Sequence, residues 1–253
     1  MSEARAGYRE AVRSEVTKFL TVRSTLVVSA VLGAVLPILA VIVAASESLQ
    51  PDDTILGASV LGGAVIAQVL AASLGATLVT GEYRTGMVLA TLTACPRRLV
   101  VLAAKASVAA GATFVVILPS AAAAYGIGVV MLDGDRYATG DPIPALFGVA
   151  AAIASIAALG VAIGTMVRHS AGAVAAVVGV VLLPGLLAPL LGDVQRWIGG
   201  ASLHGVLQKL TQSSDATHEV VGSLGAWPSL AVVAAYTGAT LIGAVWVLRH
   251  RDI

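Results

Sequence analysis

Residues 55–79 read ILGASVLGGAVIAQVLAASLGATLV, a stretch without Asp, Glu, Lys or Arg. About 20 apolar residues in an α-helix cross the hydrocarbon core of a bilayer, so this stretch is long enough to span a membrane. A charge at the centre of such a helix costs about 2.5–3.5 kcal/mol on insertion scales, and the stretch avoids that cost. Five further runs share both properties: 26–45, 106–132, 143–167, 171–192 and 230–248. The sequence therefore predicts an all-α integral membrane protein with six transmembrane helices.

The composition of the whole chain agrees with this prediction. Hydrophobic residues make up 58% of the 253 residues and charged residues only 11%, whereas about 25% of the residues of a soluble domain are charged. The net charge of +1 gives no indication of nucleic-acid binding. The segments between the runs are too short for a second folded unit, so we expect residues 1–253 to form a single transmembrane domain.

Lys and Arg are distributed unequally between alternate segments, which predicts the orientation in the membrane. Residues 1–25, 80–105, 168–170 and 249–253 would lie on one side, and they hold all but three of the 15 Lys and Arg residues. The three on the opposite side are Arg136, Arg196 and Lys209. Because loops rich in Lys and Arg stay in the cytoplasm, we expect both termini to be cytoplasmic and the protein to lie in the cytoplasmic (inner) membrane.

The leader, residues 1–24, is predicted to form an amphipathic helix. Five apolar side chains recur at helical spacing beside a parallel basic stripe. The apolar residues are Tyr8, Val12, Val16, Phe19 and Leu20, and the basic ones are Arg5, Arg9 and Arg13. Such a helix would lie in the headgroup region of the lipid membrane. A solvated leader with no special task is the alternative.

The external segment 193–229 is too interrupted by charges to cross the bilayer. Within it, apolar residues follow an i, i+3, i+4, i+7 pattern that predicts short external helices before the last span. These residues are Leu203, Val206, Leu207 and Leu210. A structural cap on the outer leaflet is the favoured interpretation, and a ligand-binding lid is the alternative.

The segment between the second and third spans, residues 81–98, reads GEYRTGMVLATLTACPRR. Gly81 can release the second helix from its straight course. Residues 87–94 can form two helical turns that end before Pro96. The result would be a short helix at the cytoplasmic surface, able to transmit a push from a cytoplasmic partner into the two attached spans.

The same segment contains an acidic-aromatic-Arg group, a Thr-Gly pair, a short apolar stretch, Pro-Arg-Arg and a Lys seven residues later. In this sequence these residues are Glu82, Tyr83, Arg84, Thr85, Gly86, Pro96, Arg97, Arg98 and Lys105. The combination resembles the signature of ABC-2 type permeases, the transmembrane subunits of ATP-binding-cassette exporters, in their drug and antibiotic efflux-like subgroup. The resemblance extends to the basic leader, the six spans and the larger external segment before the last span. Many members carry a Glu shortly after the Gly-Thr pair, where this chain has Met87-Val88.

The resemblance implies a permease that pairs with a second copy, as a homodimer or with a close paralogue, on two copies of a separate ABC ATPase subunit. Residues 82–98 would form the coupling helix seated in that ATPase, which would bind ATP and Mg. No cofactor, metal or nucleic acid would be bound by this chain. Spans 55–79 and 171–192 would line the substrate path at the dimer interface.

The residues themselves also indicate an external source of energy. Gly81 and Gly86 have the spacing of a Walker A motif, but Met87-Val88 stands where Lys-Ser/Thr is required. Carriers driven by protons or sodium usually need Asp, Glu, Lys, Arg or His at membrane depth, and the six runs contain none of these. The four His residues and the lone Cys95 show no metal-ligand spacing. We therefore expect that the chain is not itself an enzyme.

Five residues within or next to the spans are candidates for a substrate path: Gln68, Ser73, Thr77, Pro184 and Pro189. The polar side chains lie on the second span, and the two prolines permit a bend in the fifth. Polar groups in spans more commonly bond to their own backbone or to a neighbouring helix, and a bend can merely shape packing. Gly160 and Gly164 form a small-xxx-small pair, which predicts close helix packing within the protomer.

Export of an amphipathic antibiotic, drug or peptide is the function that these features favour. Export of a lipid or glycan is an alternative within the same class. A non-transporting membrane scaffold or sensor, whose residues 82–98 bind a signalling partner, is an alternative from another class. An intramembrane enzyme would need paired catalytic groups at depth, which the sequence lacks.

Overall fold

The computed structural model describes residues 7–46, 49, 52–87, 93 and 97–250. Six of its helices are long and apolar enough to cross a membrane, as the sequence predicts. They are α2 (Arg23–Ala45), α3 (Ile55–Thr85), α5 (Arg98–Met131), α6 (Pro142–Val167), α7 (Ser170–Leu187) and α11 (Ala226–His250). The protein is therefore an all-α, multi-pass membrane protein.

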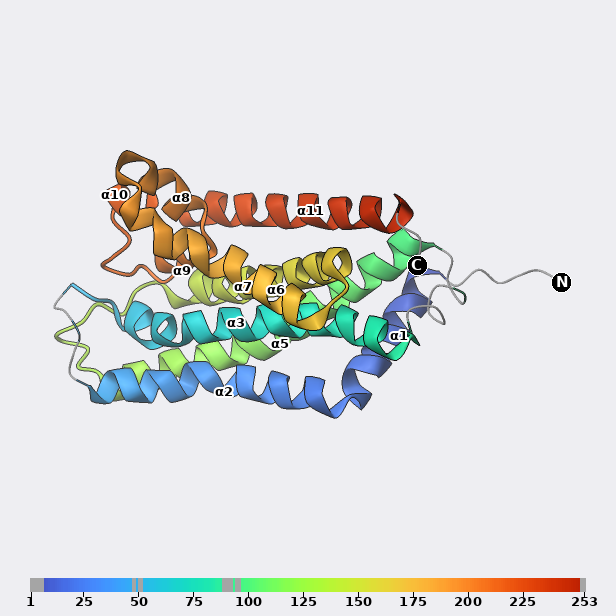
Figure 1. Cartoon of the computed structure of the whole chain (residues 1–253). Helices are drawn as coiled ribbons and strands as arrows, with labels where there is room; N and C mark the ends of the chain where they lie inside the picture. The colour runs from blue at the N-terminus through green and yellow to red at the C-terminus, as the bar shows by residue number, and fades with distance from the viewer. Residues whose placement is uncertain (1–6, 47–48, 50–51, 88–92, 94–96, 251–253) are drawn as a thin grey trace.

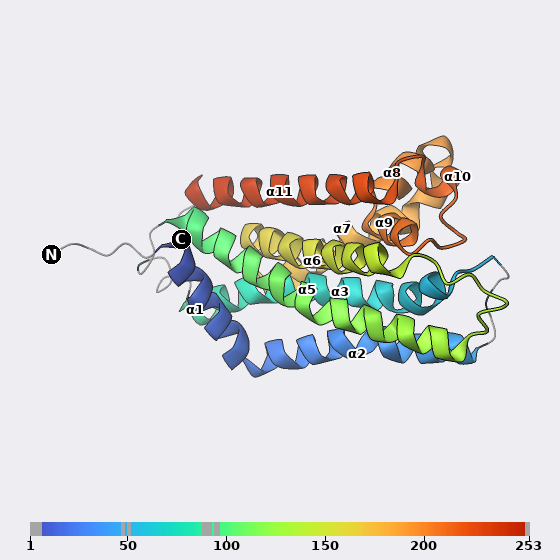
Figure 2. The same cartoon turned by 180° about the vertical axis from the view of Figure 1, so that it is seen from behind.

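The six long helices lie side by side in one bundle, with α3 and α6 near its centre (Figures 1 and 2). Shorter helices lie at the two ends of the bundle. One end, called the α1 end below, carries α1 (Tyr8–Thr21). The opposite end, called the α9 end, carries three short helices: α8 (Gln195–Ala201), α9 (Leu203–Leu210) and α10 (His218–Val221).

Close packing between α3 and α6 depends on glycine, as predicted for Gly160 and Gly164. A Cβ added at Gly160 would lie 2.5 Å from the carbonyl oxygen of Ala72, and one added at Gly164 would lie 3.0 Å from that of Ala76. A Cβ on Gly75 would collide with the carbonyl oxygen of Ala157. The two backbones approach so closely that α3 and α6 form the rigid centre of the bundle.

The helix predicted from the apolar pattern at residues 203–210 is present as α9. Its four periodic apolar residues, named above, are all buried. The Ser202 hydroxyl accepts a hydrogen bond from the Gly205 amide at 2.9 Å and so caps the helix. Just beyond α9, the carbonyl oxygens of Thr211 and Gln212 accept hydrogen bonds from the Thr54 hydroxyl at 3.2 and 3.3 Å. Because Thr54 is the N-cap of α3, the segment that contains α9 is attached directly to the central helix.

Two helix ends differ from the sequence-based expectation. The second span continues through Gly81, and it ends instead at Gly86, which adopts φ 71° in the left-handed region where glycine is favoured. The fifth run was expected to extend over 171–192, but α7 ends at Leu187 and is followed by the 3₁₀ helices Ala188–Leu190 and Gly192–Val194. Pro189 falls in the first of these, where its missing N–H prevents a regular continuation of the α-helix.

A candidate functional site at the α1 end

Four charged side chains from three helices form a closed network at the α1 end. Lys18 donates hydrogen bonds to Glu15 at 2.7 Å and to Glu82 at 2.8 Å. Lys105 donates to Glu15 at 2.5 Å and to Glu82 at 2.9 Å. Glu15 and Lys18 belong to α1, Glu82 to the last turn of α3, and Lys105 to the second turn of α5. Each ammonium group therefore bridges both carboxylates, and the network has no net charge.

The local sequence explains why these groups meet. Glu15 and Lys18 are three residues apart on one face of α1, so both turn toward the bundle. Phe19, beside them on α1, packs with Leu74 of α3 and Val108 of α5 in a small apolar cluster. The apolar contact fixes the position of α1, and the charges of α3 and α5 then lie within hydrogen-bonding distance.

The network is largely shielded from water. The exposed fractions of the side chains are 8% for Glu15, 9% for Glu82, 6% for Lys105 and 27% for Lys18. Burial by itself lowers the pKa of Lys18, but the hydrogen bonds and charges of Glu15 and Glu82 outweigh it and raise that pKa above the ordinary 10.5. Burial by itself raises the pKa of Glu82, but the charges and hydrogen bonds of Lys105 and Lys18 likewise outweigh it and lower that pKa below the ordinary 4.5. Loss of any one of the four side chains leaves an uncompensated charge in a buried place.

A second contact connects the end of α3 to the turn between α6 and α7. The guanidinium of Arg168 lies 5.6 Å from the ring centroid of Tyr83, the neighbour of Glu82. At this distance the cation is attracted by the negative face of the ring. Arg168 is the C-cap of α6 and has φ 62°.

Two further side chains connect other helices at the same end. Arg98, the first residue of α5, donates a hydrogen bond to the carbonyl oxygen of Leu248 in the last turn of α11. Such carbonyls have no partner within their own helix and favour a cation. Tyr8 of α1 donates to the hydroxyl of Ser107 in α5 at 2.8 Å. Together these contacts connect α1, α3, α5, α6 and α11 through polar side chains.

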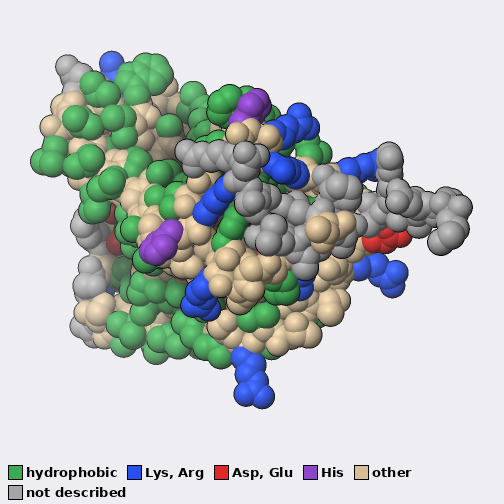
Figure 3. All heavy atoms as spheres, turned by 45° about the vertical axis from the view of Figure 1, so that its right-hand side comes forward, with side chains coloured by type: hydrophobic (Ala, Val, Ile, Leu, Met, Phe, Trp, Pro, Cys, Tyr) green, Lys and Arg blue, Asp and Glu red, His purple; other side chains and the backbone are tan. Residues whose placement is uncertain are grey.

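The eight residues assigned to ATPase coupling from the sequence divide into three groups. Glu82, Tyr83 and Arg98 turn toward the bundle and make the contacts above. Those at the surface are Arg84, Thr85, Gly86 and Arg97. Pro96 lies outside the described residues, as does most of the helix expected at 87–94. Figure 3 shows Lys and Arg side chains around this end of the molecule.

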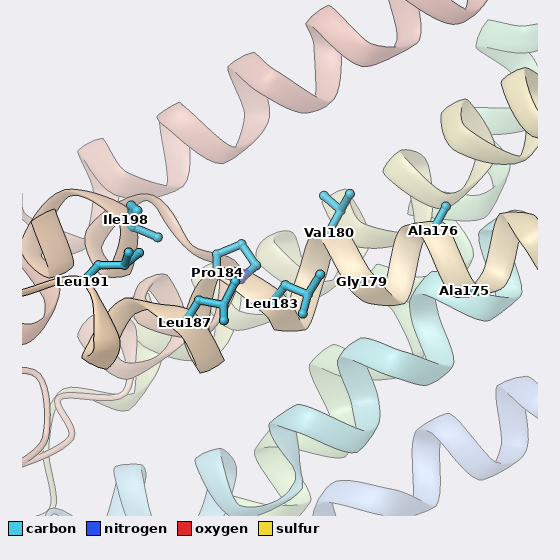
Figure 4. Close-up of a pocket in the computed structure, with 9 residues that line it drawn as sticks. All are labelled: Ala175, Ala176, Gly179, Val180, Leu183, Pro184, Leu187, Leu191 and Ile198. Atoms are coloured by element: carbon cyan, nitrogen blue, oxygen red, sulfur yellow. The ribbon is translucent and has the colours of Figure 1, made fainter.

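The five candidate path residues do not come together. Gln68 is fully buried in α3, and neither its Oε1 nor its Nε2 has a hydrogen-bond partner among the described residues. Thr77 donates to the carbonyl oxygen of Ser73 at 2.7 Å, the common fate of a hydroxyl in a span. Pro184 lines an apolar groove of about 550 Å³ along α7 (Figure 4), whereas Pro189 is exposed and does not line that groove.

Four residues of the site were not assigned a contact from the sequence: Glu15, Lys18, Lys105 and Arg168. Glu15, Lys18 and Lys105 lie outside the apolar runs, near the membrane surface, where a charged side chain must pair with another charge or reach water. This position was the sequence feature that could have indicated their contacts. In the sequence, Arg168 contributes only to the Lys and Arg count of the segment 168–170, and nothing nearby indicates Tyr83 as its partner. Among the described residues, no three His, Cys, Asp or Glu side chains are placed to hold a metal ion.

Comparison of the chain with known protein families and with curated proteins finds no match. The resemblance to ABC-2 type permeases stays a prediction, and the geometry of the α1 end carries the functional interpretation that follows.

Proposed function

We propose that this chain is the transmembrane subunit of an exporter that is driven by a separate ATPase, which docks at the α1 end. The observation that carries the proposal is the network of Glu15, Lys18, Glu82 and Lys105. It fastens α3 and α5 at the two places where they enter the segment 86–97. A force applied to that segment would therefore move three helices together.

The exposed residues beside the network supply the surface for the partner. Arg84 and Arg97 are exposed on either side of the segment, and Met87 is exposed between them. A cytoplasmic partner with an acidic rim around an apolar pocket would complement this surface. An ATPase with such a cleft would hold the segment and transmit its closure to α3 and α5.

The interior of the bundle supports the assignment of energy to the partner. Between Ile55 and Gly81 and between Ala106 and Met131, the spans contain no Asp, Glu, Lys, Arg or His, the residues on which a proton or sodium relay usually depends. The apolar groove on α7 favours an amphipathic substrate such as an antibiotic, drug or peptide over a small ion. Pairing with a second copy of the chain or with a close paralogue would enclose a path along α3 and α7.

Purification of the full chain from native membranes in mild detergent tests the proposal. We expect a nucleotide-hydrolysing subunit to elute with the chain, and amphipathic compounds to stimulate its hydrolysis. Replacement of Glu82 by Gln should reduce this stimulation while insertion into the membrane persists. A stable complex whose partner hydrolyses no nucleotide would favour the scaffold or sensor instead.

A further inference from the structure

The turn between α6 and α7 has an unusual backbone. Arg168 and Gln212 are the two non-glycine residues with positive φ in the described part of the chain. At Arg168 the angle is 62°, a left-handed conformation that L side chains rarely adopt. Gly, Asn or Asp would occupy such a position more readily. An interaction of the Arg side chain would stabilise the turn in this shape.

Tyr83 supplies that interaction. The Arg168 guanidinium lies 5.6 Å from the centroid of its ring, and Nε and Nη2 of Arg168 are buried. The Tyr83 ring in turn packs against the main apolar core. Its neighbour Glu82 is held by Lys18 and Lys105. The position of the ring is thus set by the end of α3, and the guanidinium lies against the ring.

The helix that follows Arg168 is held less firmly than the helices before it. α3 and α6 are packed closely at Gly75, Gly160 and Gly164, whereas Tyr83 lies about two helical turns beyond Gly75, at the end of α3. On α7 only Ala173, Val177 and Val181 are buried within the helix. Four large apolar side chains of α7 are exposed: Val180, Leu183, Leu186 and Leu187. His169 begins α7, and its Nδ1 accepts a hydrogen bond from the Gly172 amide at 3.3 Å.

We propose that Arg168 is a positioning residue that sets the angle at which α7 leaves the rigid α3–α6 pair, through its contact with Tyr83. A displacement at the end of α3 moves the ring, the guanidinium follows it, and α7 turns about residues 168–169. The groove that contains Val180 and Pro184 then changes shape. This inference rests on the proposed function, because it gives the α1 end a route to the helix with the groove.

The experiment measures the position of α7 without any ATPase, so its failure is distinguishable from failure of the proposed function. Spin labels are placed at V65C on α3 and V180C on α7, two exposed positions, in full-length protein with Cys95→Ser. The labelled protein is diluted with unlabelled protein in nanodiscs, and pulsed electron paramagnetic resonance gives the distance distribution. We expect Arg168→Gln and Tyr83→Leu to increase the population of displaced α7 about tenfold each.

Matched variants separate this role from a merely structural one. Arg168→Lys keeps the cation and Tyr83→Phe keeps the ring, so both should give the distribution of the parent protein. The double variant R168Q/Y83L should resemble either single variant, because both remove the same contact. Arg168→Asn removes the cation but suits the left-handed backbone, and it replaces Arg168→Gln if that variant does not fold. An unchanged distribution in Arg168→Gln and Tyr83→Leu, or independent effects of the two residues, would overturn the proposal.

Discussion

Replacing Glu82 by Gln tests the polar network most sharply, because the two side chains have nearly the same shape. The change leaves Lys18 and Lys105 facing the single carboxylate of Glu15, so the buried group acquires a net charge of about +1. Removing one partner of a buried ion pair costs about 3–5 kcal/mol. Since Lys18 keeps some contact with water and the Gln amide still accepts a hydrogen bond, we expect a loss of about 3 kcal/mol in the free energy of unfolding.

A double-mutant cycle in detergent micelles measures this effect. Lys105→Met alone leaves an uncompensated negative charge and should also destabilise the protein strongly, whereas E82Q/K105M restores neutrality and leaves the pair Glu15–Lys18. The double variant should therefore lose much less stability than the sum of the two single variants. Glu219→Gln, at an exposed position, is the matched control and should change stability by less than about 0.5 kcal/mol. Additive effects of E82Q and K105M would refute the existence of a coupled network.

Three further changes test the packing of the bundle and its α9 end. Gly75→Ala should destabilise the protein by about 1–3 kcal/mol or more, because the added Cβ would collide with the backbone of α6. The control Gly111→Ala places its Cβ in open space and should not destabilise the protein. Equal melting temperatures of the two variants would contradict the close approach of α3 and α6. Gln68→Leu should be neutral or stabilise by up to about 2 kcal/mol, since both polar atoms of the buried amide lack partners; a clear loss of stability would reveal a partner. Burial lowers the pKa of His204 below 6.5, although the charge of Asp215 acts in the opposite direction. The unfolded chain therefore binds more protons than the folded chain near this pH. As a result, the free energy of unfolding should fall as the pH decreases through 6.5. In thermal melts across this pH range, His204→Gln should lose the pH dependence of stability, and the control His218→Gln, at an exposed position, should keep it. An identical pH profile in both variants would contradict the lowered pKa of His204.

The parts of the fold that depend on composition and period could be predicted from the sequence. The six spans follow from the absence of charges over lengths that match the bilayer. The helix α9 follows from its apolar period, and the close packing at Gly160 and Gly164 follows from the small side chains. These features are local, so a single segment contains all the information needed.

The remaining features depend on which helices become neighbours. Glu15 and Lys105 are 90 positions apart in the chain, and only the docking of α1 onto α5 brings them within 2.5 Å. The contact of Arg168 with Tyr83 likewise requires the α3–α6 packing first. The end of α3 also depends on tertiary contacts. Gly81 and Gly86 both allow a helix to end, and the contacts of Glu82 and Tyr83 with other helices extend α3 as far as Gly86.

Site-specific photo-crosslinking tests the central claim most directly. A photoreactive amino acid replaces the exposed Met87 beside the network, and a control replaces the exposed Trp197 at the α9 end. After irradiation of native membranes, we predict that position 87 is joined to a nucleotide-hydrolysing subunit with a Walker A motif and that position 197 is not. Crosslinks from position 87 only to lipid, or to a protein without a nucleotide site, would contradict the account.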